Sequence, residues 1–299
     1  MLIQILKHML EVVTQEDLVQ IFTYSIQAEK KFVDEIDKIF RNAQSVPPNG
    51  FTSEDLKTGA PAFFDDYSYL RFLRMVMKLG IALNAVHLSM AYRSDMTDFL
   101  SRSSAHSNKV YSMCTEKLLE VGVLVRPPVI PLPKQTAYVK HEKYISGIQF
   151  NKRKLNSVEI SLLYHGIENN SFGMQMISGF AQVAENEEVK KYFIKGKELS
   201  KQILMVFNEL MIKSDLKIPG ESFGVPLDSS QPPFSDKLMM YLINLFSNFS
   251  LTSNALGTSF TLRPDLPLKM LNMANDIFSF AKEGAKIMIE NGWMEQPPQ

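Results

Sequence analysis

The sequence has a single cysteine, Cys114, among its 299 residues, which excludes an internal disulfide framework. Such scarcity is typical of proteins from reducing compartments, so we expect a cytoplasmic location. Cys114 stands near Tyr111 and Leu118 with no base beside it, and a thiol without a neighbouring base is a poor nucleophile. The sequence therefore predicts a buried structural cysteine.

Net charge is also absent, because 32 Lys and Arg residues are balanced by 32 Asp and Glu residues. There is no basic run either, and this excludes a general nucleic-acid binder, which needs a dense positive surface. Since like-charge repulsion is weak at zero net charge, the composition is compatible with self-association.

Long apolar runs and common catalytic motifs are missing as well. No window reaches the roughly 20 uninterrupted apolar residues that span a bilayer. The apolar start, residues 1–13, lacks the basic segment and cleavage site of a signal peptide. A Gly-rich phosphate loop, G-x-S-x-G and H-E-x-x-H are all absent. We therefore expect no membrane contact and no nucleotide.

What the chain does contain is an internal repeat. At an offset of 170 residues the following pairs match: Phe64 and Phe234, Asp66 and Asp236, Asn84 and Asn254, Ser89 and Ser259, Arg93 and Arg263, Asp95 and Asp265, Gly122 and Gly292. Upstream the offset is 171, as in Val12 and Val183, Glu16 and Glu187, and Phe22 and Phe193. Because matching residues keep a nearly constant offset over so long a stretch, the sequence indicates two copies of one domain.

Each copy has apolar residues at helical spacing over four segments. In the second copy the first helix is predicted over residues 156–184, with Asn156 as N-cap and Glu159 completing a capping box. In the first copy, Thr14 and Asp17 form a looser capping box before the second helix. A long loop rich in Pro, Gly and Ser separates the second helix from the third in both copies. Gly122 and Gly292 are expected to end the fourth helices.

The predicted fold class is all-α, with two tandem ferritin-like four-helix bundles, because the long loop supplies the crossover of that architecture. At the upstream offset Met1 corresponds to Phe172, so the first bundle is expected to have a shortened N-terminal helix. We predict a first bundle over residues 1–128, a Pro-containing linker over 129–155, and a second bundle over 156–299.

Several motifs resemble an uncharacterised family of tandem ferritin-like proteins from spore-forming Gram-positive bacteria. They are PFSDKLMM (233–240), GFAQVAENEEVKKYF (179–193), IMIENGWMEQPP (287–298), GFTSEDL (50–56), APAFF (60–64) and VRPPVIPLP (125–133). The resemblance implies a duplicated ferritin-like fold and no particular activity, since the family's function is unknown. Some relatives carry a spore-coat label.

A di-metal site of the four-helix type needs Glu-x-x-His on two helices. The histidines are His8, His87, His106, His141 and His165, and none has Glu three residues before it. The best remaining metal candidates are His165 and Glu168, which have the spacing in reverse order. Because zinc needs at least three protein ligands, we expect a solvated pair on a helix surface, no metal and no cofactor.

The polar residues repeated in both copies allow two interpretations. In the structural one, Asp95 caps a helix, Arg93 pairs with Asp95 or Glu120, and Asn84 and Ser89 are buried and hydrogen-bonded. In the other, a polar stripe binds a ligand, and its candidate residues are Asn84, Ser89, Arg93, Asn254, Ser259 and Arg263.

The sequence favours a non-catalytic structural or interaction protein of unknown activity. Its partner would be an unidentified protein or a second copy, in the cytoplasm or, alternatively, associated with the spore. A second hypothesis is a ferritin-like metal or small-molecule binder with a non-standard site in the second bundle. A third is a degenerate oxidase that has lost its ligands.

Overall fold

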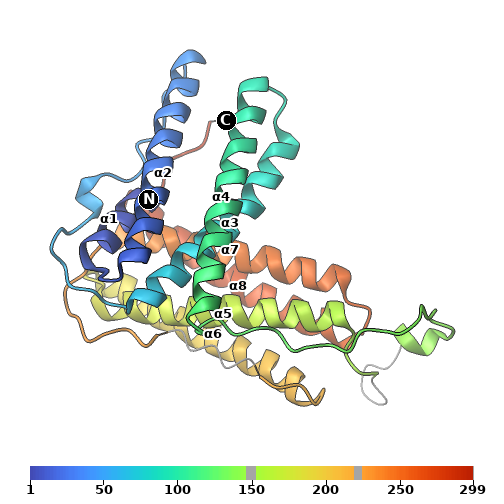
Figure 1. Ribbon diagram of the computed structural model, residues 1–299. Coiled ribbons are helices and arrows are strands. Elements are labelled where there is room, and N and C mark those ends of the chain that lie inside the picture. The colour runs from blue at the N-terminus through green and yellow to red at the C-terminus, as the bar shows by residue number, and fades with distance from the viewer. Residues whose placement is uncertain (146–152, 219–223, 299) are drawn as a thin grey trace.

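The computed structural model describes residues 1–145, 153–218 and 224–298, and these residues form eight α-helices and no strand (Figure 1). The all-α prediction is confirmed. The helices are α1 (Leu2–Val12), α2 (Glu16–Asn42), α3 (Asp66–Met90), α4 (Ser94–Glu120), α5 (Ser157–Val183), α6 (Glu187–Ile212), α7 (Asp236–Phe260) and α8 (Asp265–Glu290).

The helix boundaries reproduce the repeat read from the sequence. α2 and α6 begin 171 residues apart, and α3 and α7 begin and end 170 residues apart. Gly122 and Gly292 follow α4 and α8 with φ angles of 72° and 69°, a left-handed conformation that glycine adopts without strain. The chain therefore consists of two tandem helical repeats, α1–α4 and α5–α8.

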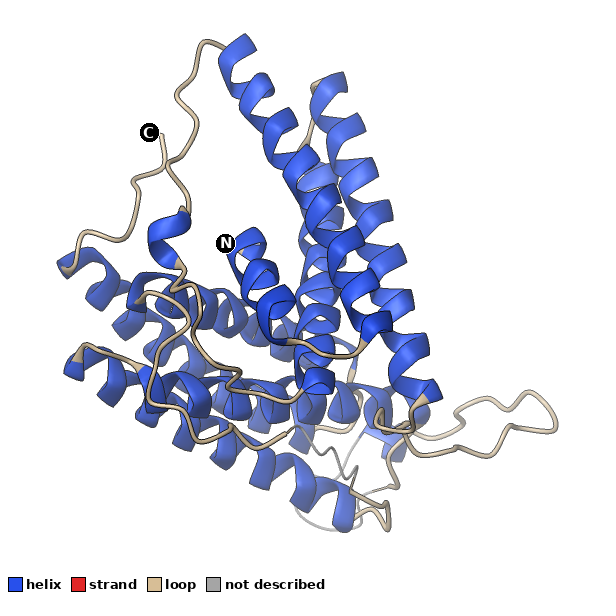
Figure 2. Ribbon diagram, turned by 60° about the vertical axis from the view of Figure 1, so that its left-hand side comes forward, coloured by secondary structure: helices blue, strands red, loops and turns tan. Residues whose placement is uncertain are grey.

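The two repeats differ most in their first helix. α1 has 11 residues and α5 has 27, which confirms the shortened N-terminal helix. Figures 1 and 2 both show α2 continuing well beyond the N-terminal end of α1. The capping box predicted for α5 is present, with Asn156 accepting from the Glu159 amide.

The turn before α2 is built differently from the prediction. Thr14 does not cap the helix; its amide and hydroxyl donate to Asp66 at 3.0 and 2.9 Å, from the start of α3. Asp236 does the same in the second repeat, accepting from the amide of Asn186 at 2.7 Å. A carboxylate from the third helix thus binds the turn before the second helix in both copies, but only α2 lacks a local cap, since Asn186 Oδ1 accepts from the amides of Glu188 and Val189 at the start of α6.

The long loops between second and third helices join the two repeats. The Lys57 amide donates to the Pro233 carbonyl at 2.9 Å, and the Ser235 amide donates to the Asp55 carbonyl at 3.1 Å. Farther along, the Leu227 amide donates to the Phe63 carbonyl at 2.9 Å. Each crossover loop therefore has its partner in the other repeat.

Apolar packing follows the same junction. Phe63 stacks on Phe180 of α5 at 6.0 Å between ring centroids, and Phe72 of α3 lies 6.0 Å from Phe172 of α5. One continuous core includes residues from both repeats, and a second core fills the far half of the α5–α8 bundle.

Among the described residues, one helix, α3, is long and apolar enough to cross a membrane. Its Leu70 and Leu73 are fully buried against the rest of the protein. α3 therefore contributes to the core of the first repeat.

Candidate functional site

Glu168 on α5 is a buried carboxylate that contacts two cations. Arg74 Nη1 and Lys78 Nζ, both on α3 of the other repeat, lie 2.5 Å from its two carboxylate oxygens. Arg74 also donates to Thr115 Oγ1 at 2.9 Å and to the Tyr111 hydroxyl at 2.8 Å. Burial opposes ionisation of Glu168, but the two cations outweigh it and lower its pKa to about 2. Glu168, Arg74 and Lys78 therefore form a buried ionic cluster that links the two repeats.

The expectation of a solvated pair on the helix surface was therefore wrong for Glu168, of which 6% is exposed. His165 lies one turn earlier, and its Nε2 is 3.2 Å from Ser253 Oγ and 3.1 Å from Asn169 Nδ2. The two metal candidates thus have different partners. Within the described ranges, no group of three or more His, Cys, Asp or Glu side chains could hold a metal ion.

His165 gives the stability a pH dependence. Burial, with Lys78 adding to it, lowers the pKa of His165 to about 4 from its ordinary value of 6.5. Below pH 6.5 the unfolded chain takes up a proton that the folded chain refuses until about pH 4, so acid favours unfolding. We expect His165 alone to lower the free energy of unfolding by on the order of 3 kcal/mol between these pH values.

Urea titrations at a series of pH values measure this loss. His165→Asn should remove about half of the loss, because burial also lowers the pKa of His8 to about 4 and His8 contributes the other half. His87→Asn, at an exposed position of α3, should leave the profile unchanged. Equal profiles for the wild type and His165→Asn would contradict the assignment. Glu168 adds a loss of the same sign at lower pH, since its stabilising ionisation is lost as the pH falls from about 4.5 to 2.

The repeated polar stripe does not form one pocket. Ser89 and Ser259 are exposed, so the prediction of a buried Ser89 was wrong. Asn84 is half-buried and donates to Ser103 Oγ at 3.0 Å, while Asn254 is buried and donates to its own helix, at the Ser250 carbonyl.

The arginines of the stripe pair with the nearby aspartates, as predicted for the first copy. Arg93 Nε lies 3.1 Å from Asp95, and Arg263 Nε lies 2.9 Å from Asp265. Their surroundings differ, because Arg93 is exposed and Arg263 is 5% exposed. Neither α4 nor α8 has a side-chain cap at its N-cap residue, Arg93 or Pro264, so the prediction that Asp95 caps a helix was wrong. Asp95 accepts only from the adjacent Met96 amide.

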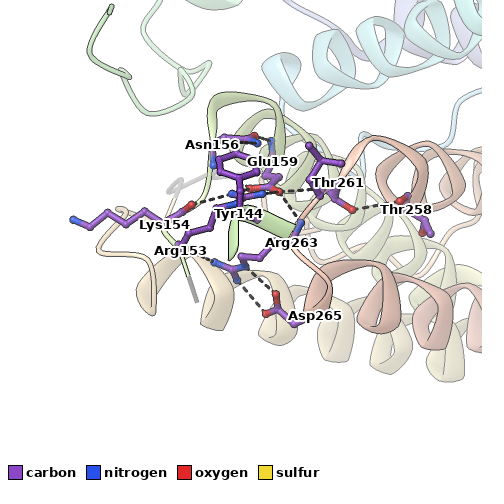
Figure 3. Close-up of polar contacts among 10 residues, drawn as sticks. Tyr144, Arg153, Lys154, Asn156, Glu159, Thr258, Thr261, Arg263 and Asp265 are labelled. Atoms are coloured by element: carbon purple, nitrogen blue, oxygen red, sulfur yellow. Dashed lines mark hydrogen bonds and ion pairs between the residues drawn. The ribbon is translucent and has the colours of Figure 1, made fainter. Parts of the chain in front are cut away.

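Arg263 is buried because a second charged cluster surrounds it (Figure 3). Its backbone amide donates to Glu159 Oε1 at 3.1 Å, and its Nη1 donates to the Arg153 carbonyl at 3.3 Å. Arg153 in turn binds Glu159 through both terminal nitrogens, at 2.7 and 2.6 Å. Glu159 is fully buried and joins the start of α5 to the α7–α8 turn. Sequence analysis identified Glu159 as a capping residue but missed this second role.

Two cavities larger than about 10 Å³ are lined mainly by residues of the second repeat. The interior one, of about 60 Å³, is lined mainly by apolar side chains such as Phe172, Phe246 and Phe280. Its Asn170 and Ser247 donate to carbonyls of their own helices, so their donors do not converge on the space. The other, of about 380 Å³, lies beside Arg263 and includes Lys154 and Lys269 in its lining.

Cys114 is buried, as predicted, and burial raises the pKa of its thiol to about 12. At neutral pH the thiol is therefore protonated and is not a nucleophile.

A family model described as a protein of unknown function, DUF3231, matches residues 1–136 and again residues 144–299. This double match confirms the resemblance to an uncharacterised family with a duplicated domain. Among solved structures, the chain is similar to one described as a "putative spore coat protein" from Bacillus halodurans, with 15% identity over 49% of this chain and 96% of that one and a TM-score of 0.45. No curated protein matches the chain.

Proposed function

The chain belongs to the DUF3231 family, whose function is unknown, and from this premise we propose that it is a non-catalytic structural or interaction protein. The observation that carries the proposal is the pairing of its buried acids. Glu168 binds Arg74 and Lys78 from the other repeat, and Glu159 binds the nearby Arg153 and accepts from the Arg263 amide in the α7–α8 turn, so these charges hold the fold together.

The pKa values support the same conclusion. A general acid or base works best when its pKa lies near the working pH. The pKa values of Glu168, His165 and Cys114 are about 2, 4 and 12, so at neutral pH none of these groups exchanges a proton readily.

We further propose that each repeat is ferritin-like, since a long loop separates the second helix from the third in both. Cytoplasmic or spore-associated location, the lack of a cofactor and the lack of a nucleic-acid partner remain predictions from the sequence.

Elemental analysis of the full chain, purified without chelator, tests the proposal. We expect substoichiometric iron, manganese, zinc and copper, because the buried Glu159, Glu168 and Asp265 pair with Arg or Lys. A one-to-one metal content that is lost in His165→Ala and kept in His87→Ala would contradict the proposal and support a metal site in the second repeat.

A second candidate is a small-molecule binder, favoured by the cavity of about 380 Å³ beside Arg263. Its lining contains Arg153, Lys154, Lys213, Arg263 and Lys269 against Glu209, Asp215 and Asp265, and this excess of basic side chains suits a small anion. Stabilisation of the wild type by inorganic phosphate in thermal unfolding, lost in Lys269→Ala, would favour it.

A further inference from the structure

The sequence contains two Asn-Gly pairs, Asn49-Gly50 and Asn291-Gly292. The amide nitrogen of a glycine that follows asparagine can attack the side-chain carbonyl carbon of the asparagine, because glycine has no side chain that obstructs the approach. A five-membered ring then forms, provided that the backbone lets this nitrogen rotate onto the Cγ atom. Since the reacting residues are the same in both pairs, the surrounding structure decides which pair reacts.

The first pair lies in the crossover loop after α2, outside any helix. Asn49 is exposed, and a Cβ on Gly50 would meet no atom within 4 Å, so the space around the pair is open. The amides of Asn49 and Gly50 donate to the Glu295 carboxylate, each at 3.1 Å. Because Glu295 is exposed as well, water competes for its oxygens, and these hydrogen bonds open readily.

The second pair closes α8 and is held by the helix. The Asn291 side-chain amide donates to the Ile287 carbonyl at 2.8 Å, and the Gly292 amide donates to the Ile289 carbonyl at 3.0 Å. The ψ angle of Asn291 is 2°, which turns the Gly292 nitrogen about a third of a turn away from the Asn291 side chain. Ring closure would therefore break both hydrogen bonds and unwind the end of the helix.

We propose that Asn49 is a site of spontaneous deamidation and that Asn291 is protected from the same reaction. The Gly50 nitrogen forms a bond to Asn49 Cγ, the bond from Cγ to Nδ2 breaks, and ammonia leaves with the proton of the Gly50 amide. Water then opens the succinimide ring, adding its hydroxyl to a carbonyl carbon and its proton to the nitrogen. Opening at Cγ gives aspartate, and opening at the backbone carbonyl carbon gives isoaspartate.

Either product changes the contact between the first crossover loop and the segment after α8. The reaction introduces a carboxylate at position 49, close to the Glu295 carboxylate that the two amides bind. Because like charges repel, we expect the segment around Glu295 to separate from the loop. Trp293 reports on this change, since it is the only tryptophan of the sequence and packs, partly buried, against the core.

Peptide mass spectrometry of the full folded chain, incubated in warm and mildly alkaline buffer, tests the inference. We expect the peptide with Asn49 to gain the mass difference between OH and NH₂ about tenfold faster or more than the peptide with Asn291, because the helix end must open before Asn291 reacts. Asn49→Gln is the control, since a longer side chain closes a larger ring much more slowly. In urea, which removes the helix, both asparagines should react at similar rates.

Quenching of Trp293 fluorescence by acrylamide measures the consequence of the reaction. Asn49→Asp, which introduces the product carboxylate directly, should raise the quenching constant, and Asn49→Gln should not. A folded chain in which Asn291 reacts as fast as Asn49, or in which Asn49 reacts only in urea, overturns the deamidation site. Unchanged quenching in Asn49→Asp overturns the separation of the segment around Glu295.

Discussion

Glu168→Gln is expected to lower the free energy of unfolding by about 3 to 5 kcal/mol, the usual cost of removing one partner of a buried ion pair. The substitution preserves the shape of the side chain and removes its charge. Arg74 and Lys78, with exposed side-chain fractions of 10% and 16%, then lose the carboxylate that both of them contact. Urea denaturation followed by circular dichroism at neutral pH measures the loss.

A surface pair on the neighbouring helix provides the control. Glu209 binds Lys213 one turn away, and both side chains are more than half exposed. Glu209→Gln should therefore leave the stability within experimental error. Equal losses in the two variants would show that the ion pair between the repeats contributes no more than a surface pair.

The triple variant Arg74→Met, Lys78→Met, Glu168→Leu separates charge from packing. Because apolar residues of similar volume can replace a buried ion pair at little cost, we expect it to recover most of the stability lost in Glu168→Gln. If it were as unstable as the single variant, the cluster would be needed for its geometry and not merely for its neutrality.

The helix boundaries could be predicted from the sequence, because the residues that set them act locally and occur in both repeats. Gly122 and Gly292 end the fourth helices through their own φ angles, and Asn156 begins α5 through a contact with Glu159 three residues away. The constant offset then transfers each boundary from one repeat to the other.

The burial of a residue could not be inferred from its counterpart in the other repeat, because burial depends on the residues that surround it. Arg93 and Arg263 are identical at the offset of 170, and each pairs with the aspartate two residues later. Arg263 is buried only because Glu159 and Arg153 surround it, and the first repeat has no counterpart of this part of α5. Identical residues at corresponding positions therefore differ in exposure where α5 has no counterpart in α1.

The ion pair between the repeats did leave a signal in the sequence. Arg74 and Lys78 correspond to Asn244 and Asn248 at the offset of 170, so the first copy carries two cations where the second carries amides. Their partner, Glu168, lies on the part of α5 that α1 lacks. A departure from the repeat thus identifies the position at which the two copies contact each other asymmetrically.

Phe172→Ala should be the most damaging substitution in the apolar core, with a loss of about 3 to 5 kcal/mol. Phe172 is 1% exposed, packs 4.9 Å from Phe246, and borders the interior cavity of about 60 Å³. Phe278→Ala, at a site on α8 that is 59% exposed, is the control and should change the stability little.

The enlarged cavity supplies a second readout for the same variant. Removal of the ring extends an apolar space between α5 and α7, and such spaces remain dry and bind small aromatic molecules. Benzene should therefore raise the melting temperature of Phe172→Ala and leave that of the wild type unchanged, because binding to the folded state alone stabilises it. If benzene had no effect on the variant, the helices would have closed over the gap, and the measured loss should then fall below the range expected for a preserved cavity.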